Sequence, residues 1–303
     1  HLVDAPLTRD RGARADAPRR ARHLAEVRQP TFRSAYRALG AVAFEGARVS
    51  VAVVDIETGE SVFAVDERIV LPTASIGKIL LLIEVSARLT DRTVSDFAIA
   101  DRSATDAVAD SGIWQHLQAP AFPIADLAAL VGATSDNLAT NVLLRQVGLD
   151  AVRSRTEKLG LVRTALLDRV RDVRGPDDAP QLSVGSTAEL AWLFQALANG
   201  HIIDPVTSQR VLSWLSLNAD LSMVASAFGR DPLSHRGVEH NTWMVNKTGT
   251  DVGVRSEAGI LRGPRAGVAY AVSVHFDDTD LPRRLRVMDA LRALGVDLLE
   301  FVH

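Results

Sequence analysis

The strongest constraint on the fold of this chain is the order in which strand patterns and helix patterns follow one another. Residues 48–65 alternate, are rich in β-branched side chains and contain the turn ETGE, which predicts a β-hairpin. Strand patterns return only near the other end, at 241–249, 257–263 and 267–276. Helical periodicity dominates from about residue 75 to 235. This order predicts one antiparallel sheet built from both ends of the chain, with a helical part inserted between them.

Two amphipathic segments are expected to flank that sheet, one around 31–45 and the other at 282–299. Ser186 and Asp204 have the position and chemistry of helix N-caps in the middle of the chain. The helices predicted there cover 124–131, 137–147, 151–159, 187–199 and 205–216, after a first one that starts near Ser75.

The chain is 303 residues long and 47% apolar, which is enough for a large core in one or two domains. We predict an α+β fold with a discontinuous α/β domain, residues 28–70 plus 236–303, and an all-helical domain, residues 71–235. A ligand site is expected in the cleft between them. Residues 1–27 show no apolar periodicity and are expected to form a solvated tail.

Composition removes several classes of function. A net charge of −3 with 23% charged residues indicates neither a nucleic-acid nor a membrane-surface partner. Cysteine is absent, so thiol catalysis and Cys-ligated metals are excluded. The eight histidines are scattered and fit no metal-ligand spacing, and no apolar run approaches the roughly 18 residues of a membrane span. We therefore expect no metal, no cofactor and no membrane span.

Lysine is rare in this chain, and the position of one lysine suggests a catalytic role. Only three of its 34 basic residues are lysines, and one of them, Lys78, ends the stretch PTASIGK. Lys78 follows Ser75 by three residues, which places both on one face of a helix. A serine hydroxyl needs a base to become a nucleophile, and a buried lysine can act as that base, whereas arginine stays protonated. Taken alone, the pair also fits a helix N-cap followed by a solvated lysine.

Two further short motifs follow in order. Residues 135–137 read SDN at the start of a predicted helix, and residues 247–249 read KTG at the end of a predicted strand. Each has an ordinary explanation, a helix cap for SDN and a strand exit for KTG. The three motifs together, on a helix, a helix start and a strand end, make coincidence a poor explanation.

With these motifs the sequence resembles the penicillin-recognising serine enzymes, the class A β-lactamases and D,D-peptidases. The likeness covers most of residues 30–303, and SDN favours the class A branch over class D. The resemblance implies a split α/β plus all-α fold. It also implies that Ser75 is the acylated nucleophile, Lys78 its proton acceptor and Ser135 the donor of a proton to the departing ring nitrogen.

Further roles are implied by the same resemblance. Asn137 would hold the acylamide side chain of the substrate, and Lys247 and Thr248 would bind its carboxylate, with Gly249 allowing the strand to approach. The backbone N–H groups of Ser75 and Thr250 would form the oxyanion hole.

Two more residues are looser candidates for the site. Arg255 lies near an auxiliary carboxylate-binding arginine of the family, and a surface arginine is the alternative. Trp114 is either an aromatic wall of the cleft or a core tryptophan.

The sequence departs from the class A pattern after LLDR at 166–169. Arg171 stands where the glutamate that activates the deacylating water is expected, and Gly175 stands near an expected asparagine. Asp172 is adjacent but shorter and one position away. Loss of a positioned base predicts slow deacylation.

Three hypotheses follow from this pattern. They are a β-lactamase-like hydrolase, a D,D-peptidase or other amidase or esterase on the same scaffold, and a non-hydrolysing β-lactam-binding protein. The expected ligand is a small β-lactam or a D-Ala-D-Ala-like peptide. We also expect a monomer that is exported, periplasmic or extracellular, by a signal not present in this chain.

Overall fold

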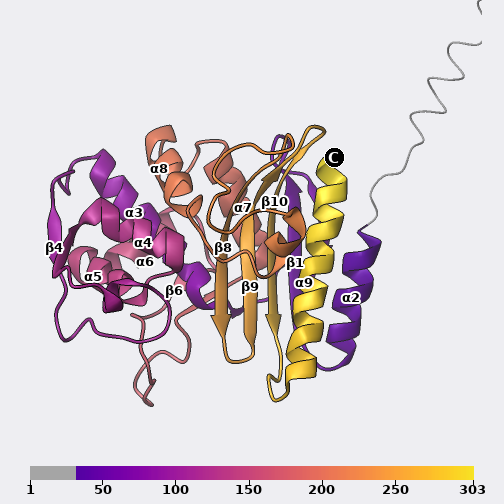
Figure 1. The fold of residues 1–303 in the computed structure, drawn as a ribbon, viewed down its shortest axis with the longest axis horizontal. Helices are drawn as coiled ribbons and strands as arrows, with labels where there is room; N and C mark the ends of the chain where they lie inside the picture. The colour runs from indigo at the N-terminus through magenta and orange to yellow at the C-terminus, as the bar shows by residue number, and fades with distance from the viewer. Residues whose placement is uncertain (1–31) are drawn as a thin grey trace, which may run out of the picture. The chain divides into compact units, whose positions relative to one another are not determined.

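The computed structural model describes residues 32–303, which form one compact unit of mixed α+β structure, as predicted (Figure 1). The tail predicted at 1–27 lies outside the described residues. A five-stranded antiparallel sheet has the strand order β2-β1-β10-β9-β8. Its strands are β1 (Arg48–Asp55), β2 (Ser61–Val65), β8 (Trp243–Asp251), β9 (Val254–Arg262) and β10 (Gly267–His275). The first hairpin and the last three strands thus share one sheet.

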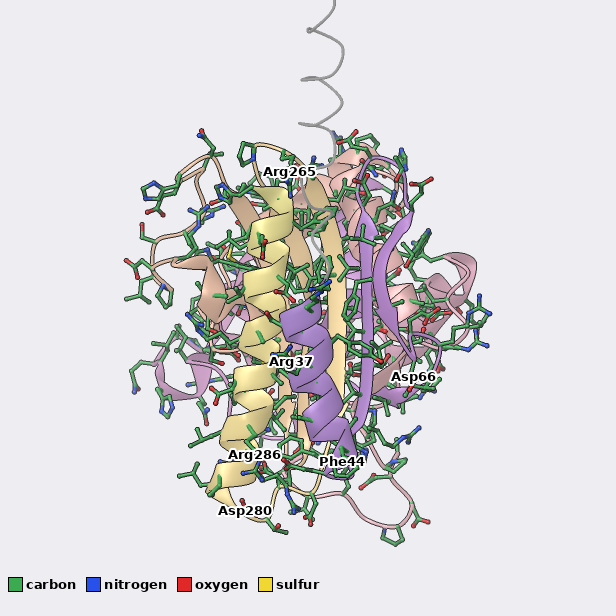
Figure 2. All side chains as sticks on the ribbon, turned by 90° about the vertical axis from the view of Figure 1, so that its right-hand side faces the viewer. Arg37, Phe44, Asp66, Arg265, Asp280 and Arg286 are labelled. Atoms are coloured by element: carbon green, nitrogen blue, oxygen red, sulfur yellow. The ribbon has the colours of Figure 1, made fainter. Side chains whose placement is uncertain are left out.

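Side-chain alternation along the strands supplies two cores, one on each face of the sheet. On β10, Val268, Tyr270 and Val272 face one cluster of buried side chains, whereas Ala269 and Ala271 face the other. The first face is covered by α2 (Arg33–Phe44) and α9 (Leu281–Val302), which run antiparallel side by side (Figures 1 and 2). The second face packs against α7 (Thr187–Ala198) and the helical part of the chain.

The N-terminus of α2 is satisfied from a distant part of the chain. No side chain of its own caps this helix. Instead, the backbone N–H of Ala35 donates to the buried Asp297 carboxylate of α9 at 2.8 Å. A carboxylate at a helix start accepts an otherwise unpaired N–H and interacts favourably with the helix dipole. This bond fixes the first described helix to the last one.

The middle helices lie where the periodicity predicts them. Ser186 and Asp204 are confirmed as N-caps, because their side chains accept from the backbone N–H of Glu189 and Thr207. The first helix is the exception, since a short 3₁₀ turn, η1 (Ala74–Gly77), precedes it. The helices are α3 (Lys78–Thr90), α4 (Ile124–Thr134), α5 (Asn137–Val147), α6 (Leu149–Lys158), α7 and α8 (Pro205–Leu215).

Several short elements have no counterpart in the sequence prediction. Two or three residues are too few to show a period, so neither small sheet of this part was expected. They are formed by β3 (Leu71–Pro72), β7 (Ser183–Gly185) and β6 (Ala165–Leu166), and by β4 (Ile99–Asp101) with β5 (Ala121–Pro123). Two further 3₁₀ turns are η2 (Trp114–His116) and η3 (Val224–Phe228).

Residues 32–303 form one unit of contacts, and the proposed domain limits at residues 70 and 236 stay a prediction. Within these residues, no helix has both the length and the apolar character needed to cross a bilayer.

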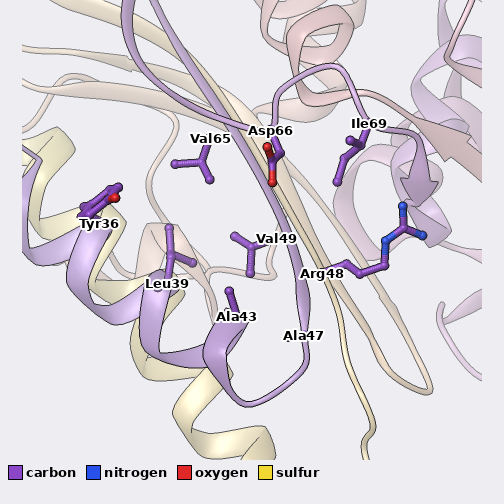
Figure 3. A pocket seen from close by; sticks show the side chains of 10 residues that line it. Tyr36, Leu39, Ala43, Ala47, Arg48, Val49, Val65, Asp66 and Ile69 are labelled. Carbon is purple, nitrogen blue, oxygen red and sulfur yellow. The ribbon is translucent and has the colours of Figure 1, made fainter.

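A hollow of about 450 Å³ lies between α2 and the edge of the sheet (Figure 3). Tyr36, Leu39 and Ala43 of α2 face Val49 and Val65 of the hairpin across it. Its lining carries no serine, lysine or histidine. This hollow therefore offers none of the groups that acyl transfer needs, and the site has to be sought elsewhere.

A carboxylic acid is buried in the core under α9. Glu257 of β9 accepts hydrogen bonds from the backbone N–H of Val224, from Asn246 and from the Tyr270 hydroxyl, at 2.8, 3.0 and 2.7 Å. Burial raises the pKa of Glu257 from 4.5 to about 7, although these hydrogen bonds act in the opposite direction. The folded protein therefore keeps this acid neutral up to a higher pH than the unfolded chain does.

We expect this group to make the protein less stable as pH rises. Between pH 4.5 and about 7, the pKa values of Glu257 in the unfolded and folded states, the folded state binds more protons. The free energy of unfolding therefore falls as pH rises. At about 1.4 kcal/mol per pKa unit, the total loss is about 3 kcal/mol. Urea titrations at pH 5 and pH 8 measure the loss. Glu257→Gln should remove most of it, whereas Glu60→Gln at an exposed position should not. An equal pH dependence in Glu257→Gln would contradict the assignment.

Candidate active site

A cavity of about 320 Å³ opens between the end of β8 and the helical part of the chain. It brings together residues from all three sequence motifs, with Ser75, Ser135 and Thr248 in its lining. The full lining consists of Ser75, Ser111, Ala133, Thr134, Ser135, Asn218, Ala219, Asp220, Thr248 and Thr250.

Ser75 sits on a tightly supported turn. Ala74 before it has φ 48°, a left-handed conformation that costs an alanine about 1–2 kcal/mol and is kept here by the surrounding packing. The Ser183 side chain of β7 donates to the carbonyl of Ala74 at 2.6 Å and bonds Thr73 Oγ1 at 2.7 Å. Gly77 leaves the space that Ser183 fills. The short sheet that the sequence did not predict therefore holds the serine in place.

The SDN segment is positioned by its middle residue. Asp136 is buried and caps α5 by accepting from Ala139 N, while its other oxygen accepts from the N–H groups of Ile113 and Trp114. Ser135 is the left-handed end of α4, with φ 53°. The aspartate thus serves as structure, and its two neighbours face the lysines.

Ser135 lies between the two motif lysines. Lys78 Nζ is 3.0 Å and Lys247 Nζ is 3.1 Å from Ser135 Oγ. Lys78 also donates to Ser135 O at 2.7 Å and to Asn137 Oδ1 at 2.6 Å, and Asn137 in turn donates to Ala109 O. Both lysine side chains are 0% exposed. Residues far apart in the chain therefore form one connected polar network.

Burial lowers the pKa of both amines. The pKa of Lys78 lies well below its ordinary value, mainly through burial and then through the charge of Lys247, while Asp136 acts in the opposite direction. Burial lowers the pKa of Lys247 to about 8, although Asp220 raises it. A lysine with a depressed pKa can release its proton near neutral pH. The pKa of Lys78 is shifted in the direction that a general base requires.

Gly249 lets the strand approach the serine turn. A Cβ built on Gly249 would overlap the carbonyl oxygen of Thr73 and lie 3.1 Å from the backbone nitrogen of Ser75. The backbone of β8 is therefore packed directly against η1. This contact places Thr248 and Thr250 beside Ser75 in the same cavity.

Neither of the two looser candidates lies in the lining of the cavity. Trp114 is fully buried, its indole N–H donates to Ala119 O at 2.9 Å, and its ring packs against Phe122, so it is a core tryptophan. Arg255 is buried and not on the surface, and it does not line the cavity. Its guanidinium donates to the carbonyls of Asp251 and Val254 and lies 3.7 Å from Asp278. Its role in substrate binding therefore stays a prediction.

Several charged side chains of the loop that follows LLDR are paired within the protein. Arg171 pairs with Asp168 at 2.7 Å and with Asp178 at 3.1 Å. Asp172 accepts from the N–H of Ala109 at 2.8 Å. Neither Arg171 nor Asp172 lines the cavity that holds Ser75. The bond of Asp172 instead fixes the loop to the segment that contacts Asn137.

Three residues near the site have no sequence motif. Asn141, one helical turn after Asn137, bonds both the N–H and the carbonyl of Val170 and so anchors the loop. Asn218 and Asp220 line the cavity from the segment after α8. The sequence around these two residues, SLNADLS at 216–222, alternates polar and apolar residues and contains no motif.

Within the described part of the chain, no group of three or more histidine, aspartate or glutamate side chains is arranged to hold a metal ion. The cavity has the hydroxyls of Ser75 and Ser135 in its lining, and two lysine amines are bonded to Ser135. Such a set can carry out acyl transfer.

Comparison with known proteins identifies relatives of the whole described unit. The model of the beta-lactamase enzyme family matches residues 32–302. A beta-lactamase from Sphaerobacter thermophilus DSM 20745 is 22% identical, with a TM-score of 0.75 over 88% of this chain and 96% of that one. A beta lactamase from Xanthomonas campestris pv. campestris is 17% identical, with a TM-score of 0.74 over 90% and 98% of the two chains.

A third solved structure has a bound β-lactam. It is a point mutant of PBP-A, described as an acyl-enzyme complex with penicillin G. It is 18% identical, with a TM-score of 0.73 over 90% of this chain and 97% of that one. These structures share the fold. No curated protein sequence matches the chain.

Proposed function

Because this chain belongs to the beta-lactamase enzyme family, we propose that it opens β-lactam rings through an acyl-enzyme on Ser75. The observation that carries the proposal is the bridging of Ser135 Oγ by Lys78 and Lys247 at the floor of the cavity that Ser75 lines. The acyl-enzyme described for the PBP-A mutant, which has the same fold, supports it.

In the proposed acylation, neutral Lys78 takes the proton of Ser75 as Oγ attacks the lactam carbonyl carbon. The N–H groups of Ser75 and Thr250 stabilise the oxyanion. The C–N bond then breaks as Ser135 gives its proton to the ring nitrogen, and the ammonium of Lys78 returns a proton to Ser135. Every proton has a donor and an acceptor in this cycle.

Substrate binding would use the remaining groups of the motifs. Lys247, Thr248 and Thr250 would bind the substrate carboxylate next to the cavity that two of them line. Asn137 donates one amide hydrogen to Ala109 O, and its other amide hydrogen would donate to the acylamide of the substrate.

Deacylation is proposed to be slow. Arg171 is held by Asp168 and Asp178, and Asp172 is held by the Ala109 N–H. In the described structure no carboxylate of this loop lines the cavity, so none is placed to activate water against the ester on Ser75. General-base help of this kind contributes about 10²–10⁴-fold to rate. The same observation favours a second candidate, a β-lactam-binding protein that retains its ligand.

Mass spectrometry of the intact protein with parallel nitrocefin hydrolysis tests the proposal. We expect one β-lactam mass to be added per chain, to persist for many minutes, and to be lost in Ser75→Ala. Ser61→Ala, at an exposed position on the strand most distant from β8 in the sheet, should label normally. Rapid hydrolysis without an adduct would contradict slow deacylation, and the absence of both an adduct and hydrolysis with every β-lactam tested would contradict the acyl-enzyme.

A further inference from the structure

The cavity that holds Ser75 carries a negative charge in its lining. Of the ten lining residues in this part of the described chain, the one ionisable side chain is Asp220. The two lysines lie beneath that lining, fully buried and bonded to Ser135. The lining therefore carries a carboxylate, and the two amines lie directly behind Ser135.

Asp220 is held in place by buried asparagines. Its backbone carbonyl accepts from Asn218 and Asn246, at 3.2 and 3.3 Å, and its N–H donates to Asn218 at 3.2 Å. The backbone N–H of Ala219, the residue before Asp220, donates to Ala133 O at 2.9 Å. This segment therefore bridges the end of α4, which is followed by Ser135, and strand β8, which carries Lys247.

The side chain of Asp220 has one oxygen engaged. Oδ1 accepts from the N–H and the hydroxyl of Ser222, at 3.1 and 2.6 Å. Asp220 is partly exposed and its charge acts on Lys247, whose pKa it raises. No cation of the described structure forms a salt bridge with Asp220, and Arg255 is occupied by Asp278. The carboxylate is therefore available to a ligand.

We propose that Asp220 selects substrates whose leaving portion carries a cationic group beside its carboxylate. This inference rests on the proposed function, because it assumes that Lys247 and Thr248 bind the substrate carboxylate. A leaving portion with a carboxylate alone is attracted by Lys247 and repelled by Asp220. A zwitterionic one pairs with both, its carboxylate with Lys247 and its cation with Asp220. The substrate class is thus a β-lactam or acyl-amino acid with a positively charged leaving portion.

Two cephalosporins with the same acylamide side chain provide the test. One carries a pyridinium at the C3′ position and the other a neutral acetoxy group, so that they differ in one charge on the leaving side. The wild-type protein should be acylated faster by the pyridinium compound. Asp220→Asn should lower the ratio of the two acylation rate constants about ten-fold, as expected for a unit charge a few ångströms away. Raising the ionic strength should bring the two acylation rate constants of the wild-type protein closer together.

Asp96→Asn is the matched control, since it removes the same charge at an exposed position of the helical part. Its ratio should equal that of the wild type. An unchanged ratio in Asp220→Asn, with acylation intact, would overturn the inference and leave the proposed function standing.

A second measurement does not depend on acylation. In Ser75→Ala, the dissociation constants of both cephalosporins are measured by NMR titration, with and without Asp220→Asn. The inference is supported if Ser75→Ala binds the pyridinium compound more tightly and if this preference is lost when Asp220→Asn is added. Equal binding of both compounds in Ser75→Ala would overturn it, even if no variant forms an adduct. A wild-type protein that neither forms an adduct nor hydrolyses any β-lactam would overturn the proposed function.

Discussion

Replacing Lys78 with arginine is expected to slow acylation of Ser75 by about 10³-fold, within the range that general-base catalysis contributes. The positive charge is kept, but a guanidinium does not release its proton at accessible pH. Lys78 is suited to the role because burial and the neighbouring Lys247 hold its pKa well below the ordinary value. The rate is measured as the appearance of the penicillin adduct in the intact-protein mass spectrum.

The controls separate loss of the base from loss of the fold. Lys158→Arg makes the same change at the exposed third lysine and should leave the rate unaltered. Because the chain has no cysteine, Lys78→Cys introduces a single thiol that bromoethylamine converts to an amine of nearly the length of lysine. Alkylation should restore acylation, and thermal unfolding checks folding. Normal labelling of Lys78→Arg would show that Lys78 is not the base.

The sequence was most informative where a function needs particular residue types in particular places. Three short motifs predicted a common site, and the structure has Ser75, Ser135 and Thr248 in the lining of one cavity. The sheet was predictable for a different reason. Its strands are nine residues or nearly so in β1, β8, β9 and β10, long enough for the period of two to stand out.

The sequence was least informative where side-chain environment depends on tertiary packing. Trp114 and Arg255 have the right residue types for a cleft, but Trp114 packs in the core and Arg255 is held by Asp278. No local pattern distinguishes an aromatic side chain that points into a cleft from one that points into the core. Asp220 was not predicted as a site residue, because a single aspartate in a loop matches no motif. Its place in the cavity depends on the packing of this loop against β8.

The loop after LLDR lies between these two cases. The sequence alone shows that residue 171 is an arginine and not a glutamate. The positions of the loop's charges did not follow from the sequence, because they depend on pairs formed on folding. Arg171 pairs with Asp178 seven residues later, and Asp172 accepts from Ala109, which is 63 residues away in the chain. Long-range bonds of this kind are outside the reach of a local motif.

Replacing Gly249 with alanine is expected to reduce acylation of Ser75 by about 100-fold or more. The added methyl group would overlap the carbonyl oxygen of Thr73, a backbone atom that does not rotate away. Thr73 O is itself fixed, since it accepts from the N–H of Ile76 at 3.1 Å. The end of β8 must therefore move from η1, and with it Thr248 and Thr250. Misplacement of catalytic groups by about 1 Å costs on the order of 100-fold in rate.

Gly40→Ala is the matched control, because a Cβ on Gly40 meets no atom within 4 Å. Gly40 lies inside α2, so this variant should gain about 0.5–1 kcal/mol of stability and acylate at the wild-type rate. Unfolding in urea shows whether Gly249→Ala remains folded, and X-ray diffraction of that variant measures the separation of Ser75 from Thr250. A folded Gly249→Ala protein that acylates normally would mean that the close approach of β8 to the serine turn is not needed for the reaction.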